Sequence, residues 1–202
     1  GTPMDRFEAM HGLAIKKFGT AAAVAELLGA SEADVQAALD AVVAEGMAMA
    51  AKGAFMLTPK GQQMLATEYP GRFGALRADP ECAAGYARFE LVNSELKALI
   101  TDWQTMDVAG SRVPNDHSDR EYDAAVIDRL GGLHERAEPV LAALASRLAR
   151  LGRYHARLDH ALDQAEGGRI EFVSGAKIDS YHTVWFELHE DLLRVLDRRR
   201  DD

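Results

Sequence analysis

The chain has 202 residues, of which 48% are hydrophobic and 27% are charged, values typical of a globular protein long enough for one large domain or two small ones. Its formal net charge of -9 opposes non-specific attraction to nucleic-acid phosphates or anionic lipid. Charges interrupt every apolar stretch before the ~18 residues of a membrane span. A single cysteine, Cys82, excludes an internal disulfide and a multi-cysteine zinc site.

The start of the chain carries no targeting pattern. Gly1-Thr2-Pro3 has the character of an expression remnant, so we take Met4 as the native start. No charged segment followed by an apolar one comes after it, and we therefore expect a cytoplasmic protein.

Residues 4–70 predict a series of short elements. Gly19 marks the end of a first helix, Thr20 and Ser31 are helix N-caps, and Lys52-Gly53 is a turn between two strands. In chain order we expect helices over 4–18, 21–28 and from Ser31 to Gly46, strands over 47–50 and 55–58, and a helix over 60–68 that Pro59 opens.

This order of helix, helix, turn, helix, hairpin and helix resembles a winged helix-turn-helix domain. The run Phe55-Met56-Leu57-Thr58-Pro59-Lys60-Gly61 is similar to that family's second wing strand entering the next helix. The resemblance covers residues 4–70 and implies three helices plus a β-hairpin, a fold whose usual role is to read DNA.

The charges of this segment argue against DNA binding. Residues 19–51 contain no Lys or Arg, whereas a helix that reads the major groove needs basic neighbours for the phosphates. The same stretch carries five acidic side chains, Glu26, Glu32, Asp34, Asp40 and Glu45. We therefore expect a surface that docks another protein or a second copy of the chain, and DNA binding is disfavoured.

The second part of the chain is helical in period. Breakers at Tyr69–Gly74 and at Asp79-Pro80 predict a linker over 71–81, followed by a domain over 82–202. Apolar residues then repeat at alternating steps of three and four, which predicts an antiparallel helical bundle and a mainly α protein. The three seams are Phe89, Val92, Leu96, Leu99, Trp103, Met106; Leu141, Leu144, Leu148, Leu151, His155, Leu158, Leu162, Ala165; and Ile178, Tyr181, Trp185, Leu188, Leu192, Val195.

A shorter fourth helix is expected between the first two seams. Ser118 and Glu121 form a capping box at its start, and Gly131-Gly132 mark its end. We interpret residues 107–117 and 167–175 as loops.

Histidines on the seams are the first candidate site. His155 stands where its seam neighbours are Leu or Ala, and His182 and His189 share one face of the last helix. They are the candidate catalytic residues, with Asp159, Tyr181 and Trp185 as ligand-binding neighbours. The arrangement is compatible with a metal site, an acid/base pair or a ligand pocket, and equally with a core histidine whose ring is satisfied. His-Glu-x-x-His, a repeated Glu-x-x-His and Asp-x-x-x-His are all absent, so no metal is expected, and the cofactor is left open.

Arginines form a second feature. Arg147, Arg150, Arg153 and Arg157 would cover about 120° of one helix at 100° per residue. Such a stripe can hold a phosphorylated ligand or an acidic partner, or it can be a solvated face. We take Arg150, Arg153 and Arg157 as candidate ligand-binding residues.

The last helix carries a second resemblance. The run Ile178-Asp179-Ser180-Tyr181-His182-Thr183-Val184-Trp185-Phe186-Glu187-Leu188-His189-Glu190-Asp191-Leu192-Leu193 is similar to small proteins that accompany phosphoenolpyruvate-utilising dikinases and related phosphotransferases. The resemblance implies an accessory subunit of an ATP-dependent enzyme. That family's phosphocarrier histidine lies in a Thr-x-Gly-Gly setting, which no histidine here has.

Two functions follow as hypotheses. The first is an accessory, non-catalytic or co-catalytic, subunit of a phosphotransferase, in which the winged helix docks a larger protein and the bundle supplies a histidine pocket. The alternative is a dimeric, ligand-responsive transcription regulator. A metal-dependent enzyme acting alone ranks third, and a self-sufficient enzyme is disfavoured because the sequence has no phosphate loop, dinucleotide-binding glycine motif or nucleophile elbow.

Overall fold

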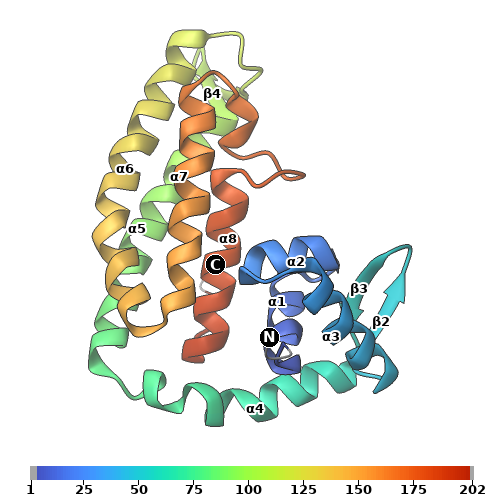
Figure 1. The fold of residues 1–202 in the computed structure, drawn as a ribbon. Coiled ribbons are helices and arrows are strands. Elements are labelled where there is room, and N and C mark those ends of the chain that lie inside the picture. The colour runs from blue at the N-terminus through green and yellow to red at the C-terminus, as the bar shows by residue number, and fades with distance from the viewer. Residues whose placement is uncertain (1–3, 201–202) are drawn as a thin grey trace. The chain divides into compact units, whose positions relative to one another are not determined.

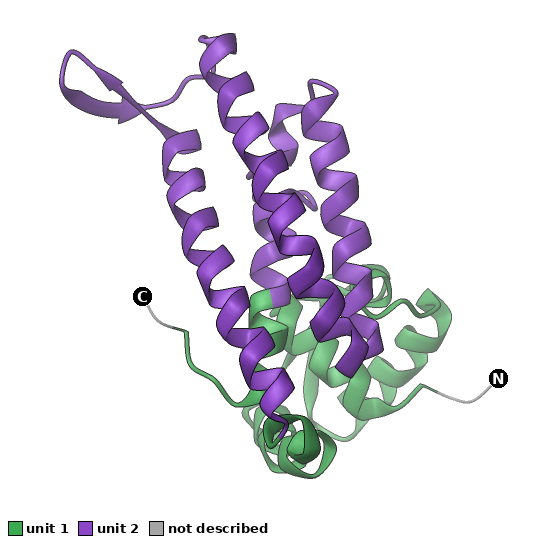
Figure 2. Cartoon of the chain, turned by 90° about the vertical axis from the view of Figure 1, so that its left-hand side faces the viewer, with its two compact units in different colours: residues 1–78, 189–202 green, residues 79–188 purple. Residues whose placement is uncertain are grey.

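The protein is mainly helical, with small antiparallel sheets. A computed structural model describes residues 4–200, so the expected remnant Gly1-Thr2-Pro3 lies outside the described residues. Two compact units divide the chain (Figure 2): residues 4–78 with 189–200 form unit 1, and Asp79–Leu188 form unit 2. The expected domains, 4–70 and 82–202, divide the chain differently, because unit 1 includes the end of the last helix.

The elements follow one another as Figure 1 labels them. They are α1 (Arg6–Lys16), β1 (Gly19–Thr20), α2 (Ala21–Leu28), α3 (Glu32–Ala44), β2 (Ala48–Ala51), β3 (Ala54–Leu57), α4 (Pro59–Arg77), α5 (Pro80–Gln104), β4 (Thr105–Val108), β5 (Ser111–Pro114), α6 (Arg120–Arg147), η1 (Ala149–Leu151), α7 (Gly152–Glu166), η2 (Ile170–Phe172) and α8 (Tyr181–Leu196).

Unit 1 packs three helices and α4 around a small sheet. Thr20 and Ser31 cap α2 and α3 through their hydroxyl oxygens, as the sequence predicts. The strands lie in the order β1-β3-β2, all antiparallel. Lys52 and Gly53, both with positive φ, make the predicted turn between β2 and β3. The shared core is apolar and includes Leu13, Val24, Val35, Leu39, Val42, Phe55 and Leu65.

The end of α1 differs from the prediction. Lys17, with φ of 67°, follows the last helical residue, whereas we expected the helix to reach residue 18 and end at Gly19. Gly19 instead pairs with Phe55 as the start of β1. Gly19 and Thr20 form β1 and pair with β3. This pairing satisfies backbone N–H and C=O groups that would lack partners at the end of a longer helix.

The expected linker over 71–81 is wrong, because residues 71–77 continue α4 beyond Pro70. Tyr69 and Phe73 lie one helical turn apart, and each packs against Phe7 of α1, with ring centroids 5.4 and 6.0 Å away. Burying this pair against the core offsets the hydrogen bond that proline cannot donate. The chain leaves helical geometry only briefly before Pro80, and Asp79 caps α5.

A buried polar network crosses unit 1. His11 Nδ1 lies 2.6 Å from the Tyr69 hydroxyl, and His11 Nε2 lies 2.9 Å from Asp191 Oδ1. Both His11 and Asp191 are buried. Because a buried polar group without a partner is costly, this network fixes the position of α1 relative to Tyr69 and Asp191.

Unit 2 is built from the helices α5, α6 and α7 and the first half of α8. Helix α5 buries the seam residues Phe89, Val92, Leu96, Leu99 and Trp103, as predicted. Met106, the last residue of that seam, lies in β4 instead. Residues 105–114 form the hairpin β4–β5 around Ala109 and Gly110, both with positive φ, where we expected a loop.

The helices after the hairpin also differ from the prediction. Helix α6 is continuous through Gly131-Gly132 and Pro139, and its cap is Asp119 instead of the expected Ser118 and Glu121 box. The middle seam is not one helix: Leu148 is extended, and η1 separates α6 from α7. The expected loop over 167–175 contains η2. Within residues 4–200 no helix combines the length and apolarity that a bilayer crossing requires.

The network in unit 1 gives a stability prediction. We expect Asp191→Ala to lower the free energy of unfolding by about 3 kcal/mol, since it leaves a buried His11 nitrogen without its partner. Urea unfolding monitored by circular dichroism measures the loss. Asp40→Ala, at an exposed position on α3 of the same unit, is the control and should change stability little. Equal losses in the two variants would show that the network does not stabilise the fold.

Candidate functional site

Two antiparallel helices of unit 2 bring two histidines and two carboxylates together. Helices α6 and α7 pack against each other and are joined by the short η1 segment (Figure 1). His134 and Glu138 lie one turn apart on α6, and His155 and Asp159 lie one turn apart on α7. Because the helices run in opposite directions, each histidine faces the carboxylate of the other helix.

The distances confirm this cross-pairing. His134 Nε2 lies 2.5 Å from Asp159 Oδ1, and His155 Nε2 lies 3.4 Å from Glu138 Oε1. His134 Nε2 is also 3.9 Å from Glu138 Oε1, and His155 Nδ1 is 3.6 Å from Asp159 Oδ2. The two imidazole rings are stacked, with centroids 5.4 Å apart and planes at 12°.

The cluster has a closed base and an open mouth. The side chain of His134 is 5% exposed, whereas those of His155, Asp159 and Glu138 are 34%, 47% and 52% exposed. One ligand atom is therefore fixed in the interior, and the other three residues meet solvent, from which an ion can enter.

Tyr181, at the start of α8, closes the base. Its hydroxyl lies 2.8 Å from His134 Nδ1, and its ring is fully buried. Burial, and then the nearby carboxylates of Asp159 and Glu138, raise the pKa of Tyr181 above its ordinary value, so the phenol stays protonated. A neutral hydroxyl on Nδ1 orients the imidazole and leaves Nε2 directed at the cluster, the arrangement found around metal-binding histidines.

The four residues suit a divalent transition metal. One ligand atom from each residue can be chosen so that all four lie within 4.8 Å of one another. Tetrahedral ligands at zinc distances are about 3.3 Å apart; His155 Nε2 and Glu138 Oε1, at 3.4 Å, are near that separation, whereas His134 Nε2 and Asp159 Oδ1, at 2.5 Å, would move apart to bind an ion. Two carboxylates also neutralise a dication. In the part of the chain that the structure describes, this is the one group of three or more His, Cys, Asp or Glu residues with such geometry.

Of the residues predicted from the sequence, His155 and Asp159 belong to the cluster, and Tyr181 hydrogen-bonds to its buried histidine, His134. Trp185 is a packing residue, stacked on Phe89 at 4.9 Å, with its indole N–H donating to Asn93 Oδ1 at 2.9 Å. The His155 side chain is half-buried and lies at the solvent-exposed side of the cluster.

His182 and His189 lie outside the cluster. The ring of His182 makes no hydrogen bond within residues 4–200, and burial lowers its pKa. His189 belongs to unit 1, where its Nδ1 lies 3.1 Å from Arg200 Nη1. The structure therefore separates the three histidines that the sequence placed in one pocket.

The arginine stripe is wrong as a single helical face, because α6 ends at Arg147. Arg157 is held in the interior of unit 2, where its Nη2 lies 2.7 Å from Glu187 and 3.4 Å from Asp179. Its Nε and Nη1 are buried with no hydrogen-bond partner. Arg150 is half-buried and Arg153 exposed. Arg157 is thus a buried structural ion pair.

Sequence reasoning missed His134 and Glu138. The patterns sought placed the carboxylate before the histidine, or two histidines on one helix. The chain has the reverse order on two helices, His134-x-x-x-Glu138 and His155-x-x-x-Asp159. Two His-x-x-x-carboxylate pairs flanking a helical turn are the signal that would have found the site.

Comparison with known proteins adds no assignment, since no family model, curated protein or solved structure matches the chain. The interpretation of the cluster therefore depends on its geometry alone.

The buried arginine gives a second prediction. We expect Arg157→Met to lower stability by about 3–5 kcal/mol, because it removes the guanidinium that lies 2.7 Å from the buried Glu187 carboxylate. The double variant Arg157→Met, Glu187→Leu should recover most of that loss, since no buried charge remains. Chemical unfolding of both variants measures the difference. A double variant as unstable as the single one would contradict this view of the pair.

His182 gives a prediction about pH. Burial keeps its folded-state pKa below the ordinary value of about 6.5, so the unfolded chain binds more protons and stability falls as pH drops below that value. Between about pH 7.5 and pH 5, the melting temperature of His182→Gln should fall by less than that of the unchanged protein. His160→Gln, at an exposed position, is the control and should behave as the unchanged protein does.

Proposed function

We propose that unit 2 binds one divalent transition-metal ion through His134, Glu138, His155 and Asp159. The observation that carries the proposal is the cross-pairing of α6 and α7, which points two imidazoles and two carboxylates at one small volume. Tyr181 orients the buried ligand from behind.

The donor set selects the class of metal. Two imidazole nitrogens with two carboxylate oxygens suit zinc and its first-row neighbours, whereas magnesium and calcium prefer oxygen ligands alone. We therefore propose zinc or a similar ion, with Mn²⁺ binding more weakly than Co²⁺ or Ni²⁺. The exposed side of the site leaves room for a water molecule or a ligand group on the metal.

For unit 1 we propose a winged helix that docks a protein. The order α1, β1, α2, α3, β2, β3 and the strand order β1-β3-β2 support this assignment. Gln36, the amide on α3, bonds Asp40 at 3.0 Å and so has its side chain engaged on its own helix. Together with the acidic residues of this segment, that geometry favours a protein partner over DNA.

Taken together, the two units describe a metal-binding adaptor protein. The role of accessory subunit to a phosphotransferase stays a prediction: the aromatic residues that carry the resemblance, Tyr181 and Trp185, are buried in unit 2, where they pack and support the cluster. Purification of the tagged chain at moderate salt separates the hypotheses. A stoichiometric nucleotide-binding protein would support the accessory role, and specific duplex DNA would support the regulator.

Metal titration tests the proposed site directly. Isothermal calorimetry with ZnCl₂ should give one site per chain, and saturation at about 100 times Kd should stabilise the fold by about 2.7 kcal/mol. Glu138→Gln and His155→Gln should each weaken binding at least about tenfold, and Tyr181→Phe by about tenfold through His134.

Matched controls keep this test specific. Glu135→Gln and His160→Gln change an exposed glutamate on α6 and an exposed histidine on α7 that are not among the four ligands. They should leave affinity unchanged. Equal loss in ligand and control variants, or no saturable site in the unchanged protein, would contradict the proposal.

A further inference from the structure

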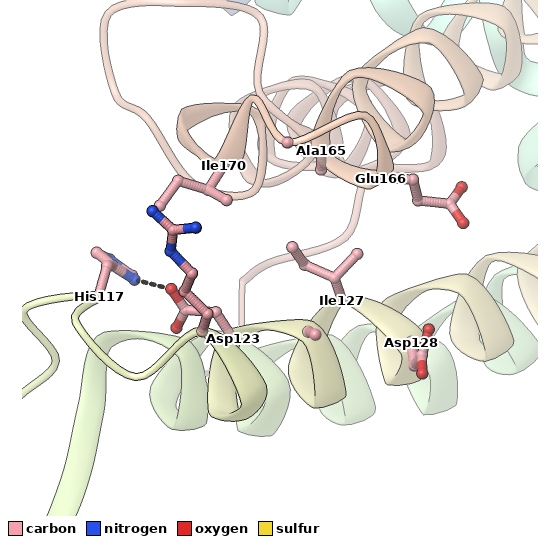
Figure 3. Close-up of a pocket in the computed structure, with 10 residues that line it drawn as sticks. His117, Asp123, Ile127, Asp128, Ala165, Glu166 and Ile170 are labelled. Carbon is pink, nitrogen blue, oxygen red and sulfur yellow. Dashed lines mark hydrogen bonds and ion pairs between the residues drawn. The ribbon is translucent and has the colours of Figure 1, made fainter.

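A pocket of about 650 Å³ lies in unit 2, apart from the metal cluster. Its lining comes from the start of α6, the residue His117 just before it, and the end of α7 with η2 (Figure 3). The volume is in the range of small-molecule sites. None of the four proposed metal ligands lines it.

One end of the pocket holds an oriented histidine. His117 Nδ1 lies 2.9 Å from Asp123 Oδ2, and Asn115 Nδ2 donates to the other carboxylate oxygen at 2.9 Å. Asn115 in turn accepts from the backbone N–H of His117 at 2.9 Å. Asp123 is 5% exposed. Because the carboxylate can only accept, Nδ1 carries the proton and Nε2 is left for a ligand.

The backbone at this position also points to a function. His117 has φ of 62°, an uncommon conformation for a residue with a side chain. Its ring lies against Trp103, with centroids 4.6 Å apart. Trp103, Asp123 and Asn115 together hold the imidazole in a conformation that the chain would not adopt freely, as is common where a side chain serves a site.

The pocket also contains charges without partners. Within residues 4–200, Arg120, Asp128 and Glu166 each line the pocket and form no ion pair. Other arginines of α6 are paired, Arg129 with Asp102 at 3.0 Å and Arg136 with Glu95 at 2.8 Å. A set of opposite charges that line one pocket and stay unpaired is suited to a ligand that carries both signs.

The charges are separated along the pocket. Figure 3 shows Asp128 and Glu166 at the end away from His117, with Ile127 and Ala165 between. Arg120 and Asp128 both lie on α6, where their positions differ by about 12 Å along the helix axis. A single α-amino acid is too short to bridge that distance, whereas an extended chain of three residues spans about 10 Å.

We propose that this pocket binds a short peptide of about three residues with free ends, its carboxylate on Arg120, its amine on Asp128 and Glu166, and one of its N–H groups donating to His117 Nε2. The apolar side chains of Ile127, Ala165 and Ile170 line the path between the two ends and contact its middle. This ligand is independent of the metal ion proposed above, and its site shares no residue with the metal cluster.

Chemical-shift titration of the full chain with tri-alanine tests the proposal. Resonances of residues around His117 and Ala165 should shift and saturate. N-acetyl-tri-alanine and tri-alanine amide, each lacking one terminal charge, should bind at least about tenfold more weakly, the loss expected when a charged hydrogen-bond partner goes unpaired.

Variants assign each end. Arg120→Gln should weaken the binding of tri-alanine but not that of tri-alanine amide, which has no carboxylate. Asp128→Asn should weaken the binding of tri-alanine but not that of N-acetyl-tri-alanine, which has no amine. Glu121→Gln, on the same first turn of α6 but outside the pocket, is the control and should have no effect. Circular dichroism and melting temperature confirm that each variant is folded.

The proposal is overturned if tri-alanine causes no saturable shifts, if the blocked peptides bind as well as the free one, or if Arg120→Gln weakens all three equally. Zinc titration of the same variants should be unchanged. Failure of the peptide proposal would therefore not contradict the proposed metal site, and failure of the metal proposal would not contradict the peptide site.

Discussion

The antiparallel pairing of α6 and α7 is the constraint on which the account of unit 2 depends. His134 is buried on the seam of α6, and a buried imidazole without partners costs about 1–3 kcal/mol for each unsatisfied nitrogen. Asp159 of α7 and Tyr181 of α8 supply those partners. The His134 side chain thereby links α6, α7 and α8. The register of α6 against α7 that results brings Glu138 opposite His155.

The same physical rule explains the other buried polar groups. His11 is paired with Tyr69 and Asp191 in unit 1, and Arg157 is paired through its Nη2 with Glu187 in unit 2. These interactions add modest net stability, because burial costs each group its hydration. Their main effect is on specificity, since a helix shifted by one residue would leave a polar atom unpaired in an apolar core.

Local sequence signals predicted much of the fold. The caps at Thr20 and Ser31, the hairpin at Lys52-Gly53 and the apolar seam of α5 are all present. Each depends on residues close together in the chain, where propensity and periodicity apply directly.

The failures have tertiary causes. Gly131-Gly132 cost helix propensity of about 1 kcal/mol each, yet Leu130 and Leu133 on either side are buried, and their packing keeps α6 continuous. Tyr69 and Phe73 do the same for α4 around Pro70. His134 and Glu138 were missed because the patterns sought did not include a histidine followed four residues later by a carboxylate, and the cross-pairing of two such pairs exists only between two helices.

The most direct measurement of the central claim is anomalous diffraction at the zinc absorption edge from crystals grown with one equivalent of zinc. The account predicts one strong peak about 2.0–2.2 Å from nitrogen atoms of His134 and His155 and oxygen atoms of Glu138 and Asp159. A peak elsewhere, or none at this cluster, would contradict it.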